Sequence, residues 1–309
     1  MDETDLALCR SLIMNSRMPY SELGKTLDLT PQAVHRRVQS LIEAEIITGT
    51  GTFLTLRAQG RMWVVIFGWS RVASMDEVAT KLKSESDVAV FFVASGNYVY
   101  IHGAVSDAND MASFVTRVQK VAMIHDVQVG IVPSPPQAPK DALSRLDLRL
   151  IKSLQEDARK PISEVAEEVG VSVKTAKRKL DRMVEEDLVQ FSIHWRPDTQ
   201  GDTVTNIHLS IKEDVEREKV AFHLIKRMAA GVIRTYSFSN LPNQLVVMLW
   251  TRNVKEMQRT CRELEADGFF HSVVPNIIRD IHYYDEHRHA ILDGMLKKDS
   301  PSEQESAGQ

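Results

Sequence analysis

The sequence contains few of the features that mark exported, membrane-spanning or disulfide-bonded proteins. Only two of its 309 residues are cysteines, Cys9 and Cys261, and neither has another cysteine or a histidine at the spacing of a zinc site. No apolar run approaches the roughly 18 residues that predict a membrane span. The opening segment MDETDLALCR is acidic and lacks the basic and then apolar order of a secretory signal. We therefore expect a cytoplasmic protein that contacts no membrane and holds no metal.

The sequence also lacks an excess of basic residues and the common motifs of catalysis. Its 38 lysines and arginines are outnumbered by 42 acidic residues, which gives a formal net charge of -4, whereas nucleic-acid binders are typically basic. No glycine-rich phosphate loop, nucleophile elbow or pair of catalytic carboxylates stands out. We therefore predict no catalytic residues and no cofactor, and DNA binding can be inferred only from where the charges lie.

What the sequence does contain is an internal repeat. The 43 residues from Asp5 align without a gap with the 43 residues from Asp147, and apolar positions match almost throughout. Such self-similarity indicates two copies of one structural unit in tandem. The identical positions include Asp5/Asp147, Leu12/Leu154, Arg17/Arg159, Pro19/Pro161, Ser21/Ser163, Glu22/Glu164 and Arg36/Arg178.

Each copy begins with the pattern of a winged helix-turn-helix. Ser21 and Thr30 in the first copy, and Ser163 and Ser172 in the second, are good N-caps for two helices separated by a tight turn. The segment TGTGTFLTL after Ile47 predicts a turn with short strands, as in a wing. The third helix of each copy carries an apolar stripe, formed by Val34, Val38 and Leu41 in the first copy and by Ala176, Leu180 and Met183 in the second.

Each copy continues with strand and helix patterns in the order βαββαβ. The two middle strands flank Ser95-Gly96-Asn97 in the first copy and Leu241-Pro242-Asn243 in the second. In the second copy, the first helix of this order is expected at residues 215–228. This order is typical of a ferredoxin-like domain. We therefore predict an α+β fold in which two winged helix-turn-helix domains alternate with two ferredoxin-like domains.

Composition suggests where these domains begin and end. The segment PSPPQAPKD has four prolines in nine residues, which favours an extended connector, and the polar segment at the end of the sequence favours disorder. We expect winged helix-turn-helix domains at 1–52 and 142–195, ferredoxin-like domains at 53–132 and 196–290, a linker at 133–141 and a disordered tail at 297–309.

The third helix of each copy is basic on the face opposite its apolar stripe: residues 31–40 contain two arginines, one histidine and no acid, and residues 173–182 contain five basic residues against one acid. A charged helix face is most often merely solvated. Two copies in register favour instead contact with the major groove of double-stranded DNA, where glutamine suits adenine and arginine suits guanine or phosphate. We predict that the second copy anchors the protein on phosphates and the first copy reads bases. The predicted DNA-binding residues are Gln32, His35, Arg36, Arg37, Gln39 and Ser40 in the first copy, and Lys174, Lys177, Arg178, Lys179 and Arg182 in the second.

Several short motifs occur in corresponding places of the two copies. They include the openings Asp5-x-x-Leu8 and Asp147-x-x-Leu150, followed by Pro19-Tyr20-Ser21-Glu22-Leu23 and Pro161-Ile162-Ser163-Glu164-Val165. Arg196-Pro197-Asp198-x-x-Gly201 resembles a connector into an α/β domain. Together these motifs resemble two fused copies of the leucine-responsive regulatory protein/AsnC family, the feast/famine transcriptional regulators.

The resemblance implies an assembly and a ligand. In that family the ferredoxin-like domains pair face to face, which implies a covalent pseudo-dimer here and a homo-oligomer of such chains. It also implies a small-molecule effector, commonly an amino acid, near the hairpins, at Ser95, Gly96, Asn97, Asn240 and Asn243. Val99 stands where the family has an acidic residue, and the second hairpin lacks the family's glycine. We therefore expect an effector other than a simple α-amino acid.

Two other functions are compatible with parts of this sequence. Siroheme decarboxylases have the same double architecture, but their His-Asn-Tyr motif corresponds here to Phe91-Phe92-Val93 and Arg234-Thr235-Tyr236, which contain no histidine. The histidine-rich segment from His282 to His289 could instead offer ligands to a transition metal, although such clusters are more often solvated. His102 and His208 lie on predicted strands and are expected to be core or sheet-face residues.

Overall fold

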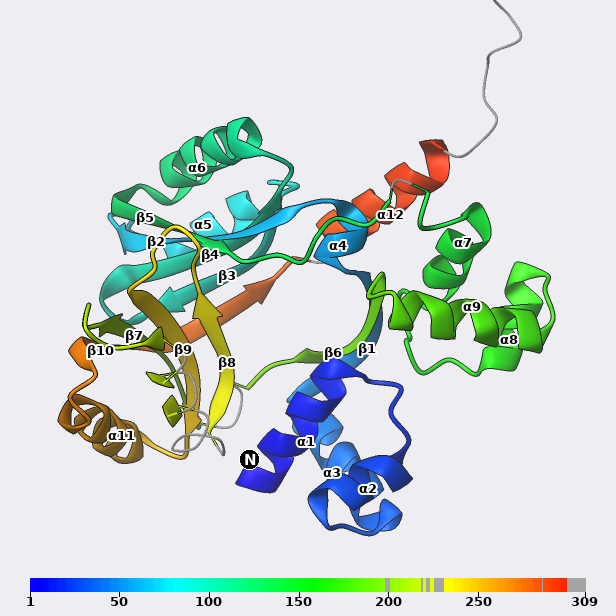
Figure 1. The fold of residues 1–309 in the computed structure, drawn as a ribbon, viewed down its shortest axis with the longest axis horizontal. Helices are drawn as coiled ribbons and strands as arrows, with labels where there is room; N and C mark the ends of the chain where they lie inside the picture. Colours follow the sequence, from blue (N-terminus) through cyan, green and yellow to red (C-terminus); the bar gives the residue numbers. More distant parts are fainter. Residues whose placement is uncertain are drawn as a thin grey trace, which may run out of the picture.

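The computed structural model describes residues 1–139, 141–197, 201–217, 219–220, 223–224, 231–284 and 286–298. It places two helix-turn-helix regions beside an eight-stranded β-sheet whose two halves, one from each ferredoxin-like domain, face each other like two sheets (Figure 1). The predicted α+β class, with two helix-turn-helix regions and antiparallel sheets of two ferredoxin-like domains, is confirmed. None of the helices in the described part of the chain is long and apolar enough to cross a membrane.

The first helix-turn-helix region comprises α1 (Glu3–Met14), α2 (Tyr20–Leu27) and α3 (Pro31–Glu43). Helix α3 begins where predicted, because the Thr30 hydroxyl accepts a hydrogen bond from the Ala33 N–H at 3.2 Å. The second region comprises α7 (Arg145–Ser153), α8 (Ile162–Val169) and α9 (Val173–Glu185), and Ser172 caps α9 in the same way. The predicted apolar stripes of α3 and α9 are buried in both regions.

The predicted wings differ from the structure. Residues 47–54 form one strand, β1 (Ile47–Leu54), which pairs antiparallel with β6 (Val189–Trp195) of the other repeat. Because the second repeat supplies a complete partner for the backbone of β1, neither copy folds its strand back into a hairpin of its own. The result is a two-stranded ribbon shared by both repeats, followed by the short helix α4 (Leu56–Gln59).

The first ferredoxin-like domain has the predicted order of strands and helices. Its elements are β2 (Met62–Ser70), α5 (Met75–Leu82), β3 (Val88–Ala94), the turn η1 (Ser95–Asn97), β4 (Tyr98–Val105), α6 (Ala108–Ala122) and β5 (Ile124–Val132). The second domain comprises β7 (Thr203–Ile211), β8 (Val232–Ser237), β9 (Gln244–Thr251), α11 (Val254–Ala266) and β10 (Phe270–Tyr283). Its first predicted helix, at 215–228, lies largely outside the described residues, although positions 219, 220, 223 and 224 are helical.

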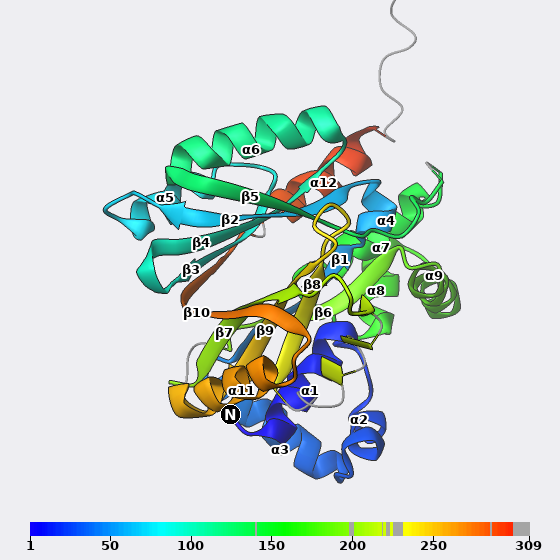
Figure 2. The same ribbon diagram turned by 60° about the vertical axis from the view of Figure 1, so that its left-hand side comes forward.

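Strand β10 joins the two domains into one sheet. Its first half pairs with β7 of its own domain, and its second half, from Ile278 to Tyr283, pairs with β3 of the first domain. The strand order is therefore β5-β2-β4-β3-β10-β7-β9-β8. Helices α6 and α11 lie on opposite outer sides, so that the inner faces of the two halves meet (Figure 2). Phe67 and Phe238 touch across this interface, with ring centroids 6.0 Å apart, which confirms the predicted packing of the two sheets within one chain.

The opposite side of this sandwich is closed by the turn at Ser239 and Asn240 instead of a paired strand, and the Ser239 N–H donates to the Ile131 carbonyl at 2.8 Å. Beyond β5 the chain enters the proline-rich linker, whose prolines have no N–H to donate to a neighbouring strand. The Asn240 amide takes over this contact, accepting from the Ile131 N–H at 2.8 Å and donating to the Val129 carbonyl at 2.7 Å. The two repeats are thus related by approximate symmetry that β10 and the linker break.

Two arginines that are identical in both repeats hold the helix-turn-helix regions together. The Arg17 guanidinium donates to the carbonyls of Ala158 and Lys160, and the Arg159 guanidinium donates to the Ser16 carbonyl. Arg159 also lies over the Tyr20 ring at 4.6 Å. The contacts are reciprocal, which gives a structural reason for the same residue at both positions.

The chain continues beyond the last strand in a way that the sequence did not predict. Helix α12 (Glu286–Lys298) crosses the expected domain end at residue 290 and packs on α7, where Lys152 and Asp293 form an ion pair at 2.8 Å. Leu292 on α12 is buried in the apolar core of the second helix-turn-helix. Residues 297 and 298 are therefore helical and not part of a tail, and residues 299–309 lie outside the described residues.

Candidate functional site

Helix α3 presents five of its six predicted DNA-binding residues to solvent. Gln32, His35, Arg36, Gln39 and Ser40 are exposed, whereas the buried residues of the helix lie on its other side. The His35 ring meets Tyr20 of α2 edge to face at 5.8 Å, which fixes one side of this surface. Glutamine amides and an arginine on one exposed helix face are groups that can read base edges.

Helix α9 presents a smaller cationic surface than predicted. Lys174, Lys177 and Arg178 are exposed. Lys177 lies 3.8 Å from Asp181, one turn further along the same helix, so part of its charge is already balanced. Lys174 and Arg178 therefore remain the strongest candidates in α9 for contacts with phosphate oxygens.

The other three predicted DNA-binding residues have partners inside the protein. Arg37 pairs with Asp2 at 2.9 Å and with Asp5 at 2.6 Å. In the second repeat, Lys179 and Arg182 pair with the two oxygens of Asp147, at 3.0 and 2.9 Å. Because these cations connect the third helix of each region to its first helix, they are better explained as residues that hold the region together.

The predicted effector residues are split between two places. Ser95, Gly96 and Asn97 form an exposed turn beside β10, where the Ser95 hydroxyl donates to the Ile277 carbonyl at 3.4 Å. Asn240 is occupied by its contacts with β5, and the Asn243 carbonyl accepts from the Ile211 N–H at 2.7 Å. Each hairpin thus lies against a different strand, and none of these five residues lines the cavity described next.

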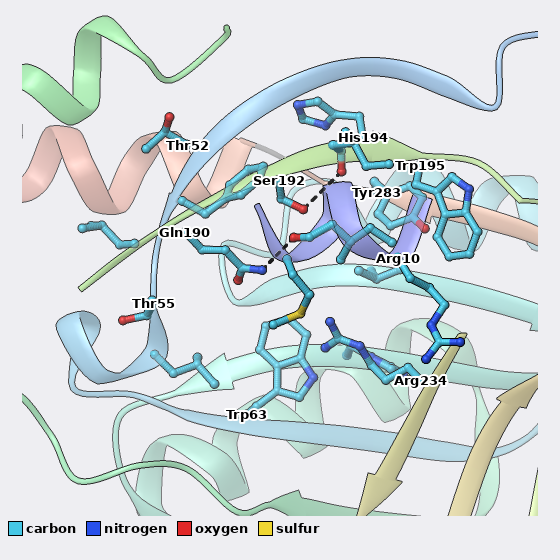
Figure 3. Close-up of a pocket in the computed structure, with 18 of the residues that line it drawn as sticks. Arg10, Thr52, Thr55, Trp63, Gln190, Ser192, His194, Trp195, Arg234 and Tyr283 are labelled. Carbon is cyan, nitrogen blue, oxygen red and sulfur yellow. Dashed lines mark hydrogen bonds between the residues drawn. The ribbon is translucent and has the colours of Figure 1, made fainter. Parts of the chain in front are cut away.

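A cavity of about 1100 Å³ lies between the first helix-turn-helix, the β1–β6 ribbon and the two sheets. Figure 3 shows residues from all of these parts around it. Helix α1 contributes Arg10, the ribbon contributes Trp195, and the sheets contribute Trp63, Phe92 and Arg234. Sequence reasoning missed this cavity, because its lining comes from segments that are far apart in the chain and follow no common spacing.

Basic side chains outnumber acidic ones around this cavity. Of the described residues that line it, three are arginines, Arg10, Arg57 and Arg234, and one is acidic, Asp187. Arg57 is held by hydrogen bonds to the carbonyls of Glu186 and Pro136, at 3.2 and 2.6 Å. Such a lining favours an anion over a cation.

The predicted core histidines are both on buried strands. His102 of β4 lines the cavity between Phe92 and Tyr236, with ring centroids 4.9 and 5.2 Å away. Its burial, and to a lesser degree the charge of Arg234, lower its pKa to about 3. His208 of β7 lies in the interface of the two sheets, 2.7 Å from the Tyr100 hydroxyl, and burial lowers its pKa to about 4. Both rings are therefore neutral near pH 7.

The histidine-rich segment gives no support to a metal site in the described part of the chain. His282 stacks on Phe91 with centroids 5.7 Å apart, and His289 pairs with Glu156 at 3.1 Å. Asp285, which lies in the same segment and could offer a carboxylate ligand, is outside the described residues. No group of three or more histidine, cysteine, aspartate or glutamate side chains in the described residues is arranged to hold a metal ion.

Comparison with known proteins finds regulators for each repeat. The model of the AsnC-type helix-turn-helix domain matches residues 1–42, and that of a winged helix-turn-helix DNA-binding domain matches residues 143–190. The HTH-type transcriptional regulator LrpA of Pyrococcus horikoshii is 30% identical over 135 residues, which are 43% of this chain and 96% of LrpA. Regulatory protein AsnC of Haemophilus influenzae is 29% identical over 100 residues, 32% of this chain and 67% of AsnC.

The whole chain is similar in fold to a different kind of protein. The crystal structure of the siroheme decarboxylase NirDL superposes with a TM-score of 0.60 and 14% identity, over 95% of this chain and 99% of NirDL. The structure of NirDL in complex with an iron-uroporphyrin III analogue matches equally well, over 96% of this chain and 98% of NirDL. At this identity the similarity establishes a shared tandem fold and not a shared activity.

Proposed function

Because the chain belongs to the Lrp/AsnC-type helix-turn-helix family, we propose that it is a transcriptional regulator that binds double-stranded DNA through α3 and α9. One observation carries this proposal: both third helices keep an exposed face, of amide and basic side chains in α3 and of basic side chains in α9, while the cations needed for internal ion pairs are separate from it. Each chain acts as a covalent pseudo-dimer, and two such chains pair to form a homo-oligomer. The hairpin residues Ser95, Gly96, Asn97, Asn240 and Asn243 remain the predicted effector site of the family type.

The two helices are proposed to contribute unequally. In α3 the exposed glutamines and Arg36 suit base edges, whereas Lys174 and Arg178 of α9 suit phosphates. The equivalent residues Arg36 and Arg178 offer a matched comparison, because each is exposed at the same position of its repeat. The preferred duplex is first selected from random sequences with the full-length protein.

We expect Arg36→Ala to weaken binding to the preferred duplex by about 1–3 kcal/mol and to change binding to scrambled DNA little. The double replacement Lys174→Ala and Arg178→Ala should weaken binding to both duplexes alike. It should also reduce the slope of log affinity against log salt by about 1.8, if each residue neutralises one phosphate. Fluorescence anisotropy over a salt series measures both effects.

Lys120→Ala, at an exposed position of α6, serves as the control and should change neither affinity nor slope. An equal loss from Arg36→Ala on preferred and scrambled duplexes would contradict base reading by α3. The absence of any salt dependence would contradict DNA binding by these helices altogether.

A second candidate function is the decarboxylation of an iron tetrapyrrole, and one observation favours it. The stretches that correspond to the catalytic motif of siroheme decarboxylases, around Phe92 and Arg234, line the cavity, and His102 from β4 lies beside them. The motif positions themselves contain no histidine, and His102 comes from a strand that the motif does not include. Incubation of the full chain with siroheme under reducing conditions, followed by mass spectrometry, tests this function. We expect no loss of carbon dioxide from the substrate, and a loss that His102→Phe abolishes would establish the enzyme instead.

A further inference from the structure

We propose that the outer edge of β8 binds an extended peptide segment of another protein, which adds to the sheet as one more strand and places an acidic side chain beside Arg234. Strand β8 is the last strand of the sheet, and in the described part of the chain it pairs only with β9. Residues 233–236 of β8 line the cavity of about 1100 Å³. The inference concerns a protein partner and does not depend on DNA binding by α3 and α9.

The first ferredoxin-like domain shows how the equivalent edge is covered. Strands β3 and β8 hold the same place in their domains, because Val90 of β3 pairs with His102 of β4, and Arg234 of β8 pairs with Met248 at the equivalent position of β9. The other side of β3 is covered by residues 278–283 of β10, which run antiparallel to it. An edge of this kind in this protein therefore accepts one further antiparallel strand.

The second domain lacks such a covering strand because of the linker. Ile131 of β5 pairs with β2 where Ile277 of β10 pairs with β7, so residues 132–137 occupy the place equivalent to the covering residues of β10. Three of these six residues are prolines, which have no N–H for a strand ladder. The linker is held beside α4 instead, where the Pro136 carbonyl accepts a hydrogen bond from Arg57 at 2.6 Å. The strand position that is filled beside β3 is thus open beside β8.

An open strand edge supplies the main-chain groups that an added strand needs. In an antiparallel ladder, alternate residues of an edge strand direct their N–H and C=O groups away from the neighbouring strand. When a peptide adds to such an edge, main-chain hydrogen bonds supply affinity and alternate side chains supply specificity. The β1–β6 ribbon and α1 line other parts of the same cavity, so the edge of β8 is sheltered from the edges of other folded sheets.

The side chains of β8 indicate which sequence the peptide has. Ile281 of β10 is buried opposite the β3 residue that is equivalent to Tyr236, so we expect an apolar peptide side chain opposite Tyr236. Two residues further along β10, Tyr283 lies opposite the position that Arg234 holds in β8. Arg234 is exposed, contacts the Tyr236 ring at 6.0 Å and forms no ion pair within the described part of the chain.

Opposite charges that face each other across two antiparallel strands stabilise the pair. An acidic residue is therefore expected opposite Arg234, two positions after the apolar residue of the peptide. Figure 3 shows the Arg234 side chain among the residues that line the cavity, where a peptide on this edge would meet it.

Binding is tested by fluorescence anisotropy with the full chain, without DNA, and with the capped peptide Thr-Ile-Thr-Ile-Thr-Glu-Thr that carries a neutral dye. We expect saturable binding of one peptide per chain, and binding at least about tenfold weaker when lysine replaces the glutamate. Arg234→Glu should reverse this preference, so that the lysine peptide binds at least about tenfold better than the glutamate peptide. Because Arg234 is exposed on an edge strand, the thermal midpoint should be unchanged.

The peptide backbone gives a second test, which uses the unchanged protein. Only alternate amides of an added strand face β8, so N-methylation of one alternate set should abolish binding and N-methylation of the other set should preserve it. Arg279→Glu is the matched control, because Arg279 is exposed on β10 and does not line the cavity; it should leave the preference for glutamate unchanged.

Three results would each overturn the proposal. They are no saturable binding at millimolar peptide, equal binding of the glutamate and lysine peptides, and equal effects of the two N-methylated sets. Since no duplex is present in these measurements, a failure to bind DNA would contradict the regulator proposal and leave the peptide site standing.

Discussion

Replacing Asp147 by alanine is expected to destabilise the second helix-turn-helix by about 3–5 kcal/mol, which is the usual cost of removing one partner of a buried ion pair. The Asp147 side chain is only 1% exposed and pairs with Lys179 and Arg182. It also accepts hydrogen bonds from the Ser144 N–H and hydroxyl, at 2.8 and 2.6 Å. Although burial opposes ionisation, Ser144 and Lys179 together hold the pKa of Asp147 below its usual value. Alanine would remove the common partner of the helix cap, Lys179 and Arg182, although Arg182 would keep its contacts with Glu186 at 2.8 Å and the Ala142 carbonyl at 3.1 Å.

The equivalent change in the first repeat, Asp5→Ala, is the matched comparison. Asp5 is 16% exposed, and Arg37 would keep its second partner Asp2, so we expect a loss of only about 1 kcal/mol. Urea unfolding of the full chain, followed by circular dichroism, measures both free energies. If both variants lowered the free energy of unfolding equally, the deeper burial of Asp147 would not explain its contribution to stability.

The second large effect is expected on acidification. His102 and His208 are buried with pKa values of about 3 and about 4, whereas a histidine in an unfolded chain has a pKa of about 6.5. Below pH 6.5 the unfolded chain therefore takes up protons that the folded protein does not, and the free energy of unfolding falls until the pH reaches each folded pKa. Between pH 7 and pH 5 we expect a loss of about 2 kcal/mol for each histidine.

Urea unfolding at pH 7, 6 and 5 tests this dependence. In His102→Phe the phenyl ring would lie among Trp63, Phe92 and Tyr236, and the variant should lose about 2 kcal/mol less than the unchanged protein over this range. His271→Gln replaces an exposed histidine that pairs with Glu213 and should behave like the unchanged protein. If the free energy of unfolding fell equally in all three proteins between pH 7 and pH 5, the pKa of His102 would not be lowered in the folded protein.

The sequence predicted what depends on neighbouring residues. Thr30 and Ser172 mark the beginnings of α3 and α9, and the apolar stripes of these helices face the cores as expected, because caps and helical periodicity are local properties. It did not predict that β1 pairs with β6, or that β10 crosses to β3, because these pairings depend on how the two repeats are placed in space.

The dependence on tertiary structure also explains why the sequence did not separate the exposed basic residues of α3 from the one that forms internal ion pairs. Arg36 and Arg37 are adjacent and equally charged, yet Arg36 is exposed and Arg37 pairs with Asp5, which lies 32 positions earlier. The helix turns about 100° from one residue to the next, so neighbours point to different surroundings. A signal was nevertheless present, because the acid–base pair occurs at equivalent positions in both repeats, as Asp5 with Arg37 and as Asp147 with Lys179.

The crossing of β10 to β3 also bears on the order of events during synthesis. Domains generally fold from the N-terminus as the ribosome adds about 5–20 residues per second. The first domain has all its own strands once β5 is made, but the free edge of β3 is covered only when residues 278–283 emerge. For roughly 8–30 s that edge would offer unpaired backbone groups to any other nascent chain. Two ribosomes on one message would therefore be able to exchange β10 between their products, so that strand exchange between chains competes with closure within each chain.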